Sequence, residues 1–159
     1  MMKTAIISVI ALAAVSITAA HSASVIVRDP GLVPYTIVDD NSIPQSLTGK
    51  PGDPANGRKL AINRKKGNCL ACHVMPIPEQ QFHGETAPSL YGVGKRLSEG
   101  ELRLQLVNAK ITNDSTLMPS FYRTHGFNAV LKKFAGKSIL EAQDVEDILA
   151  YLQTLQTEQ

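Results

Sequence analysis

The chain has 159 residues and a formal net charge of +2 at pH 7, from 16 Lys and Arg against 14 Asp and Glu. This length suits one domain of ordinary size, and the near balance of charge argues against a strong field for nucleic acid or anionic lipid. Only 5% of the residues are aromatic and none is Trp, which argues against a surface on which bases stack.

The first predicted element is a secretory signal peptide over residues 1–23. Lys3 precedes an unbroken apolar run from Ala5 to Val15, and small residues follow. The run is too short and too weakly flanked to span a bilayer, although an uncleaved N-terminal anchor is the alternative. We therefore expect a periplasmic protein without a membrane span after processing. In that oxidising compartment two cysteines usually form a disulfide.

Residues 24–52 are predicted to form an extended, Pro/Gly-rich arm. Two short apolar runs, Val25–Val27 and Tyr35–Val38, are either strands or simply extended chain. The prolines and glycines between them predict little regular structure. Such an arm is either a disordered tail or an element that wraps a partner, and its apolar residues favour wrapping.

The rest of the chain, residues 53–159, is predicted to begin with a helix. Asp53 is a suitable N-cap and Pro54 suits the first helical position. The helix is expected to run to about Lys66, where Gly67 would end it.

A second helix is predicted from Ser98 to about Asn108, because Ser98 and Glu101 have the spacing of a capping box. A short helix over residues 128–136 would follow. The last helix is predicted from apolar residues at helical spacing, which are Val145, Ile148, Leu149, Leu152 and Leu155. The predicted fold class is therefore all-α, with two long loops over residues 74–96 and 109–122. Loops of this length in a small domain need an explanation.

Both cysteines of the chain lie in one motif, Cys69-x-x-Cys72-His73, for which four interpretations are open. A disulfide gives His73 no role, and a thioredoxin-like redox pair requires a βαβ context that is missing here. A structural zinc site requires four ligands, and the fourth would have to be His83 or His125. The remaining interpretation is covalent haem, for which C-x-x-C-H is the attachment signature.

Haem c fits the motif best. Cys69 and Cys72 lie about one turn apart, as thiols that add to vinyl groups on neighbouring pyrroles must, and His73 then lies under the ring and binds iron. Export supports this interpretation, since c-type attachment normally occurs outside the cytoplasm. A porphyrin would also fill the space between the two loops and replace much of an aromatic core.

The second axial ligand decides the function, because His and Met together close the iron to small ligands and suit electron transfer. Met75 follows His73 too closely to reach the opposite face of the ring. Met118, in the second loop, is therefore the candidate. The alternatives are His83, His125, a lysine or an open site, with Met118 filling a gap in the core.

His73 also needs a partner for its other ring nitrogen. The carbonyl of Pro88 is predicted to be this partner, because proline has no N–H to compete and its backbone is stiff. The alternative is that Pro88 is a simple turn residue.

Residues 53–155 resemble a class I cytochrome c. The resemblance is carried, in this order, by GDPANGRKLAINRKKGNCLACH, APSLYGVG, TLMP and LEAQDVEDILAYL. In that family a glycine of the first helix lets an aromatic of the last helix pack closely, and Gly57 and Tyr151 match these places. Ala61 departs from the aromatic that often follows the glycine, which puts the usual aromatic contact in doubt.

The flanking segments are similar to the SoxX family, the monohaem subunits of the SoxAX thiosulfate-oxidising complex. The similarity lies in LTGKPGDPANGRKLAINRKKGNCLACHVMP, in the stretch from NAKITNDSTLMP to the C-terminal helix, and in the arm. It implies one covalent haem c on Cys69 and Cys72, with His73 and Met118 on the iron. It also implies three partners: a SoxA-like dihaem or monohaem cytochrome, a SoxYZ-like carrier, and a small acceptor cytochrome c.

The predicted function is an electron-transfer subunit of a heterodimeric L-cysteine S-thiosulfotransferase, with no catalytic residue of its own. Neither cysteine is free for sulfur chemistry, and no Ser/His/Asp set has a recognisable context. The alternatives are a free-standing periplasmic cytochrome c that shuttles electrons, and a haem sensor that binds gas. A permanent subunit gains from an apolar arm, whereas a shuttle needs only a small interface.

Two surface features stay open. Residues just past Met118, namely Tyr122, Arg123 and His125, either line a partner-facing edge or pack ordinarily. A basic cluster ahead of the motif either steers an acidic redox partner or is a solvated helix face; its members are Arg58, Lys59, Arg64, Lys65 and Lys66.

Overall fold

The computed structural model describes residues 22–157, so the predicted signal peptide lies almost wholly outside the described residues. The elements in chain order are strands β1 (Ser24–Val27) and β2 (Tyr35–Val38) and helices α1 (Pro54–Ile62), α2 (Val93–Arg96), α3 (Glu99–Asn108) and α4 (Ala142–Thr154). Short 3-10 turns cover Cys69–Ala71, Ala109–Ile111 and Lys132–Phe134. The predicted helical class is confirmed, and one small two-stranded sheet is added to it. No helix within residues 22–157 has the length and apolar character needed to cross a bilayer.

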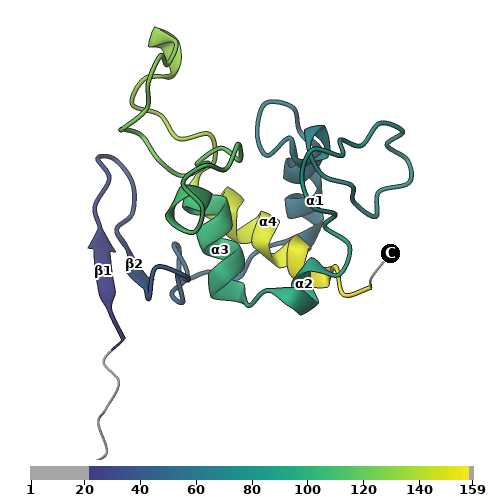
Figure 1. The fold of residues 1–159 in the computed structure, drawn as a ribbon, viewed down its shortest axis with the longest axis horizontal. Helices are drawn as coiled ribbons and strands as arrows, with labels where there is room; N and C mark the ends of the chain where they lie inside the picture. Colours follow the sequence, from purple (N-terminus) through teal and green to yellow (C-terminus); the bar gives the residue numbers. More distant parts are fainter. Residues whose placement is uncertain (1–21, 158–159) are drawn as a thin grey trace, which may run out of the picture.

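Helices α1 and α4 pack against each other at the centre of the domain, with α3 beside α4 (Figure 1). A Cβ on Gly57 of α1 would lie 1.8 Å from the carbonyl oxygen of Asp147 in α4. The glycine therefore lets the two backbones touch. The family resemblance implies that Gly57 makes room for the aromatic Tyr151. The atoms nearest to a Cβ on Gly57 belong instead to the α4 backbone, and Tyr151 lies buried one turn further along α4.

The ends of α1 agree only in part with the prediction. Asp53 caps the helix by accepting a hydrogen bond from the Ala55 N–H at 2.9 Å, with Pro54 at the first position. The helix ends at Ile62, because Asn63 adopts an extended conformation. The expectation that Gly67 stops the helix is wrong. Gly67 lies past a turn, where a Cβ would come within 3.0 Å of the Leu60 carbonyl oxygen.

Helix α3 has the predicted capping box, in which Ser98 and Glu101 each bond the other's backbone N–H. Helix α4 begins with a similar reciprocal pair, Glu141 and Asp144. The short helix predicted over residues 128–136 is wrong, since only Lys132–Phe134 forms a 3-10 turn. Its apolar side chains are exposed, so no packing stabilises a longer helix there.

The N-terminal arm is more ordered than expected. β1 and β2 pair antiparallel, from Ser24 opposite Val38 to Val27 opposite Tyr35. The chain then runs along the helices and buries Ile43 and Leu47 in the main core. The arm therefore packs on its own chain, which the sequence pattern did not indicate.

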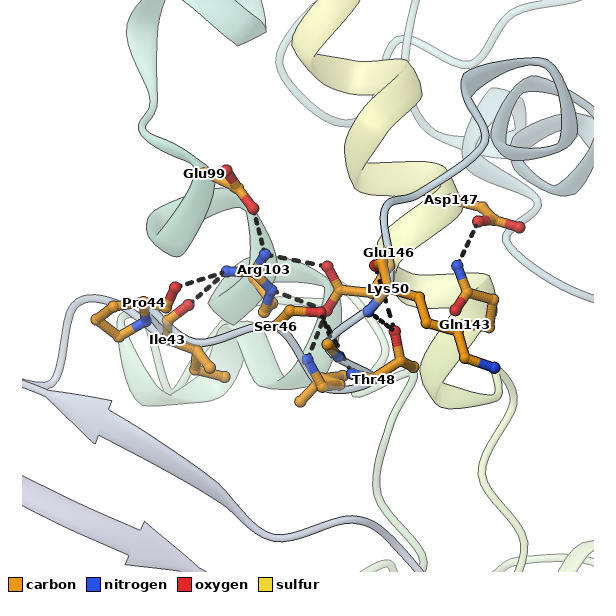
Figure 2. A network of polar contacts seen from close by, with 12 residues as sticks. Ile43, Pro44, Ser46, Thr48, Lys50, Glu99, Arg103, Gln143, Glu146 and Asp147 are labelled. Carbon is orange, nitrogen blue, oxygen red and sulfur yellow. Dashed lines mark hydrogen bonds and ion pairs between the residues drawn. The ribbon is translucent and has the colours of Figure 1, made fainter.

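A buried polar cluster fixes the arm to the helices (Figure 2). Arg103 of α3 is fully buried and donates to both carboxylate oxygens of Glu146 in α4, at 2.9 and 3.0 Å. Arg103 also donates to the Ile43 carbonyl at 2.7 Å, and Glu146 accepts from the Leu47 N–H at 2.8 Å. A charged pair that is buried on all sides needs such additional hydrogen bonds to offset its desolvation.

Candidate functional site

The cysteine motif begins directly after a strained residue. Asn68 adopts a left-handed conformation (φ 50°), and the 3-10 turn Cys69–Ala71 follows. The His73 N–H donates to the Cys69 carbonyl at 2.9 Å, which closes one turn around the two cysteines. Gly84 lies against this turn, where a Cβ would lie 2.1 Å from the Ala71 carbonyl oxygen. The loop beyond the motif can therefore fold tightly back over it.

Both cysteines are free thiols, with Cys72 exposed and Cys69 half-buried. Burial raises the pKa of the Cys69 thiol to about 11, so the neutral thiol is favoured at physiological pH. Within the described part of the chain, no group of three or more His, Cys, Asp or Glu residues is arranged to hold a metal ion. The described residues around the motif thus lack the four ligands that a structural zinc site requires.

His73 is held by one of its ring nitrogens. Nδ1 lies 2.6 Å from the carbonyl oxygen of Pro88, and because a carbonyl only accepts, Nδ1 carries the proton. In the neutral imidazole Nε2 then has a free lone pair, as a metal ligand requires.

The loop around Pro88 is braced from two sides. The Ala87 and Leu90 N–H groups donate to the carbonyls of Cys72 and Val74, at 3.0 and 2.9 Å. Arg96 of α2 donates to the carbonyls of Ser89 and Tyr91, at 2.9 and 2.5 Å. The part played by Arg96 could not be found in the sequence, because nothing local marks its two carbonyl partners.

Met118 lies in the second long loop, partly buried against the core. Its N–H donates to the Thr116 hydroxyl at 3.2 Å, and the neighbouring Leu117 is 95% exposed. Just beyond, the Ser120 hydroxyl donates to the Asn108 side chain at 2.6 Å, which fixes the loop to the end of α3. Met75, by contrast, is fully buried in the core.

Each of the two other candidate histidines makes one hydrogen bond through Nδ1. His83 accepts from the Met75 N–H at 3.2 Å, and among the described residues its buried Nε2 has no hydrogen-bond partner. The Nδ1 of His125 lies 2.8 Å from the Asp29 carboxylate. Of the two alternatives left open for Tyr122, ordinary packing holds, because Tyr122 is buried and packs on Tyr35.

The basic cluster is only partly available for a partner. Arg58 forms an ion pair with Glu79, and Lys66 forms one with Asp144 at 2.8 Å. These pairs tie α1 and the following turn to other parts of the domain. Lys59, Arg64 and Lys65 are the members that remain for steering.

The residues fit a haem of the c type. Two neighbouring free thiols and an imidazole with one nitrogen fixed lie on one loop, and a half-buried thioether lies on the other. Figure 1 shows both loops on the same side of the helices, the teal one after α1 and the green one after α3. A helical domain with this donor set defines a c-type cytochrome.

Comparison with known proteins agrees with this class. Residues 54–156 match the cytochrome c family model. The fold is similar to a chain in the crystal structure of SoxXA from P. pantotrophus, with a TM-score of 0.69 and 40% identity over 74% of this chain and 91% of that one. Comparison with curated proteins gave no significant match. The chain belongs to the cytochrome c family and, within it, to the SoxX cytochromes, and it carries one covalently bound haem c.

Proposed function

We propose that this chain is the electron-transfer subunit of a SoxAX-type complex, which oxidatively conjugates thiosulfate to a cysteine of a SoxYZ-like carrier protein. The observation that carries the proposal is the 40% identity to a SoxXA chain over nearly the whole length of that chain. The similarity extends beyond the haem motif, which all c-type cytochromes share, to more than two thirds of this protein.

The proposed site assigns a task to each residue of the motif. Cys69 and Cys72 hold the haem through thioether bonds, and His73 and Met118 are the axial ligands. A bound haem supplies a carrier that takes up and releases one electron at a time. The carbonyl of Pro88 keeps the proton on His73 Nδ1 and raises the basicity of Nε2, which is how such partners usually tune a ligating imidazole.

In this scheme the chain moves electrons and leaves the sulfur chemistry to its partner. Joining a carrier cysteine to thiosulfate forms one sulfur–sulfur bond and releases two electrons and the thiol proton. This chain would accept those electrons one by one from the SoxA-like haem and pass them to a small acceptor cytochrome c. Both of its own cysteines lie in the haem motif, so neither is free to react.

Exposed apolar side chains on the two haem loops support a permanent partner. Phe82 on the first loop is 89% exposed, and Leu117 on the second is 95% exposed. Beyond the second loop, Leu131 and Phe134 are more than half exposed as well. We infer that these exposed side chains contact a SoxA-like cytochrome.

The N-terminal segment supports a periplasmic location. A signal peptide over residues 1–23 would deliver the chain to the compartment in which haem c is attached. We infer that the exported protein assembles there with its partner.

Co-expression of the full-length chain with a SoxA-type cytochrome and the haem-attachment machinery tests the proposal. We expect the two to co-purify, and we expect the haem of this chain to become reduced when thiosulfate and the carrier protein are added together. Leu117→Lys should weaken co-purification, whereas Ile26→Lys on the exposed face of the arm should not. A protein that purifies alone and reduces other cytochromes freely would instead be a diffusible shuttle.

A further inference from the structure

We propose that Asp29, on the N-terminal arm, is a positioning residue for Met118. The inference rests on the proposed role of Met118 as an axial ligand and extends it, because it identifies what holds the loop of that ligand in place. In this view the arm acts on the haem site of its own chain, by docking the segment 122–125 that follows Met118.

Asp29 is enclosed although it belongs to the arm. Its side chain is 1% exposed, and the partners of its carboxylate within residues 22–157 lie on the loop after Met118. It accepts from the Thr124 N–H at 3.1 Å, from the Thr124 hydroxyl, and from His125 Nδ1 at 2.8 Å. A buried carboxylate with three donors forms a strong anchor, because each hydrogen bond to a charged group outweighs a neutral one.

A second contact between the arm and this loop lies next to the first. The Val33 N–H donates to the Tyr122 hydroxyl at 3.0 Å, and the rings of Tyr35 and Tyr122 lie 6.4 Å apart. Tyr35 and Tyr122 are both buried. Around these contacts a cleft of about 360 Å³ separates the hairpin from the loop. The docking of the loop on the hairpin therefore depends on the Asp29 and Tyr122 contacts.

The docked segment is also fixed on its other side, close to Met118. The Phe121 and Tyr122 N–H groups donate to the carbonyls of Leu106 and Val107 at the end of α3, at 3.2 and 3.3 Å. The chain from Ser120 to His125 is thus held between α3 and the arm. If the arm side is released, this segment gains conformational freedom, and the loop that presents Met118 opens more readily.

The charged groups that face Asp29 are the loop's His125 and Arg123, with Lys110 of the 3-10 turn Ala109–Ile111 on the far side of the cleft. Arg123 itself stacks on Phe127 at 5.2 Å. Asparagine at position 29 would keep the size of the side chain but lose the negative charge that Thr124 and His125 bind.

Imidazole binding to the oxidised holoprotein tests the inference, because an added ligand replaces methionine on iron only when the loop opens. We expect Asp29→Asn to bind imidazole about tenfold more tightly than the wild type, as loss of a charged anchor of about 1.4 kcal/mol implies. Asp40→Asn is the matched control, since Asp40 lies exposed at the turn of the same arm, and its affinity should not change. Circular dichroism checks that each variant is folded.

A second variant keeps the test decisive if Asp29→Asn folds poorly. Thr124→Val removes the hydroxyl donor and keeps the backbone N–H, so a smaller increase in imidazole affinity is expected. Unchanged affinity in the folded Asp29→Asn or Thr124→Val variant would overturn the inference. Failure of the Met118 assignment itself has a different signature, namely a methionine–iron absorption band that persists in Met118→Ala.

Discussion

At the scale of single residues, the hydrogen bond from His73 to the Pro88 carbonyl determines which ring nitrogen is left to bind a metal. The bond places the proton on Nδ1, and the brace of Arg96 on Ser89 and Tyr91 keeps the carbonyl in position. His73 itself is half-buried, so packing alone would not fix its ring. The backbone carbonyl of Pro88 therefore decides which nitrogen of the imidazole can bind iron, and Arg96 supports the loop that carries it.

The two methionines of the described residues offer a direct test of ligation. Met118→Ala should abolish the near-infrared charge-transfer band that methionine gives on oxidised haem iron. Met75→Leu is the control, because Met75 is a fully buried core residue and a swap of similar volume costs less than about 1.5 kcal/mol. Absorption spectroscopy of the two oxidised proteins checks this. The assignment is contradicted if the band survives in Met118→Ala.

At the scale of elements, the crossing of α1 and α4 depends on Gly57. Gly57→Ala would place a methyl group 1.8 Å from the Asp147 carbonyl oxygen, so the helices must separate. We expect a loss of about 3 kcal/mol in the free energy of unfolding, at the upper end for overpacking. Denaturant titration followed by circular dichroism measures it.

Gly100→Ala on α3 is the control for this substitution. A Cβ there would meet the Ser42 Cβ at 3.2 Å and the Ile43 carbonyl oxygen at 3.3 Å, contacts that a shift of a few tenths of an ångström relieves. Alanine gains about 1 kcal/mol in helix propensity. The two effects offset, so stability should change by less than about 1 kcal/mol. Equal losses of unfolding free energy in Gly57→Ala and Gly100→Ala would contradict the proposal that the close contact of α1 and α4 causes the loss.

These elements also show which features can be predicted from sequence. The start of α1 at Asp53 and the capping box of α3 depend on residues within one turn, so local spacing was sufficient. The prediction for Gly67 is wrong because this residue does not adopt a left-handed conformation. It is a glycine because the backbone of Leu60 lies too close for a side chain. The hairpin and the burial of Arg103 depend on partners far along the chain, and no local pattern identifies those.

At the scale of the whole molecule, the arm is a structural part of the domain, and Arg103 is its main attachment. Arg103→Met should lower the free energy of unfolding by about 3–5 kcal/mol, because it leaves Glu146 buried without its partner. It should also open residues 24–52 to limited proteolysis, since Ile43 and Pro44 lose their donor. Arg64→Met, at an exposed position after α1, should alter neither. Resistance of the arm to protease in Arg103→Met would contradict this role.

Acid sensitivity of the fold follows from two buried carboxylates that join distant segments. Asp147 of α4 accepts from the Asp53 N–H at 2.9 Å and from Asn56 at 2.7 Å, and thereby holds the start of α1. Burial by itself raises the pKa of Asp147, but the hydrogen bonds from Asn56, Asp53 and Gln143 outweigh it, so the pKa lies below its ordinary value. The pKa of Asp29 is lowered in the same way, by Thr124 and His125 against burial.

A carboxylate whose pKa is lower in the folded state stabilises the fold above its unfolded pKa of about 3.9, and this stability is lost as the pH falls through the folded pKa. The free energy of unfolding should therefore fall between about pH 5 and pH 2. Asp147→Asn should be less stable at pH 7 and should show a shallower fall over that window, whereas Asp40→Asn should follow the wild type. Urea titrations at several pH values measure this. Parallel curves for Asp147→Asn and the wild type would mean that Asp147 is not among the groups whose protonation loosens the contact between α1 and α4.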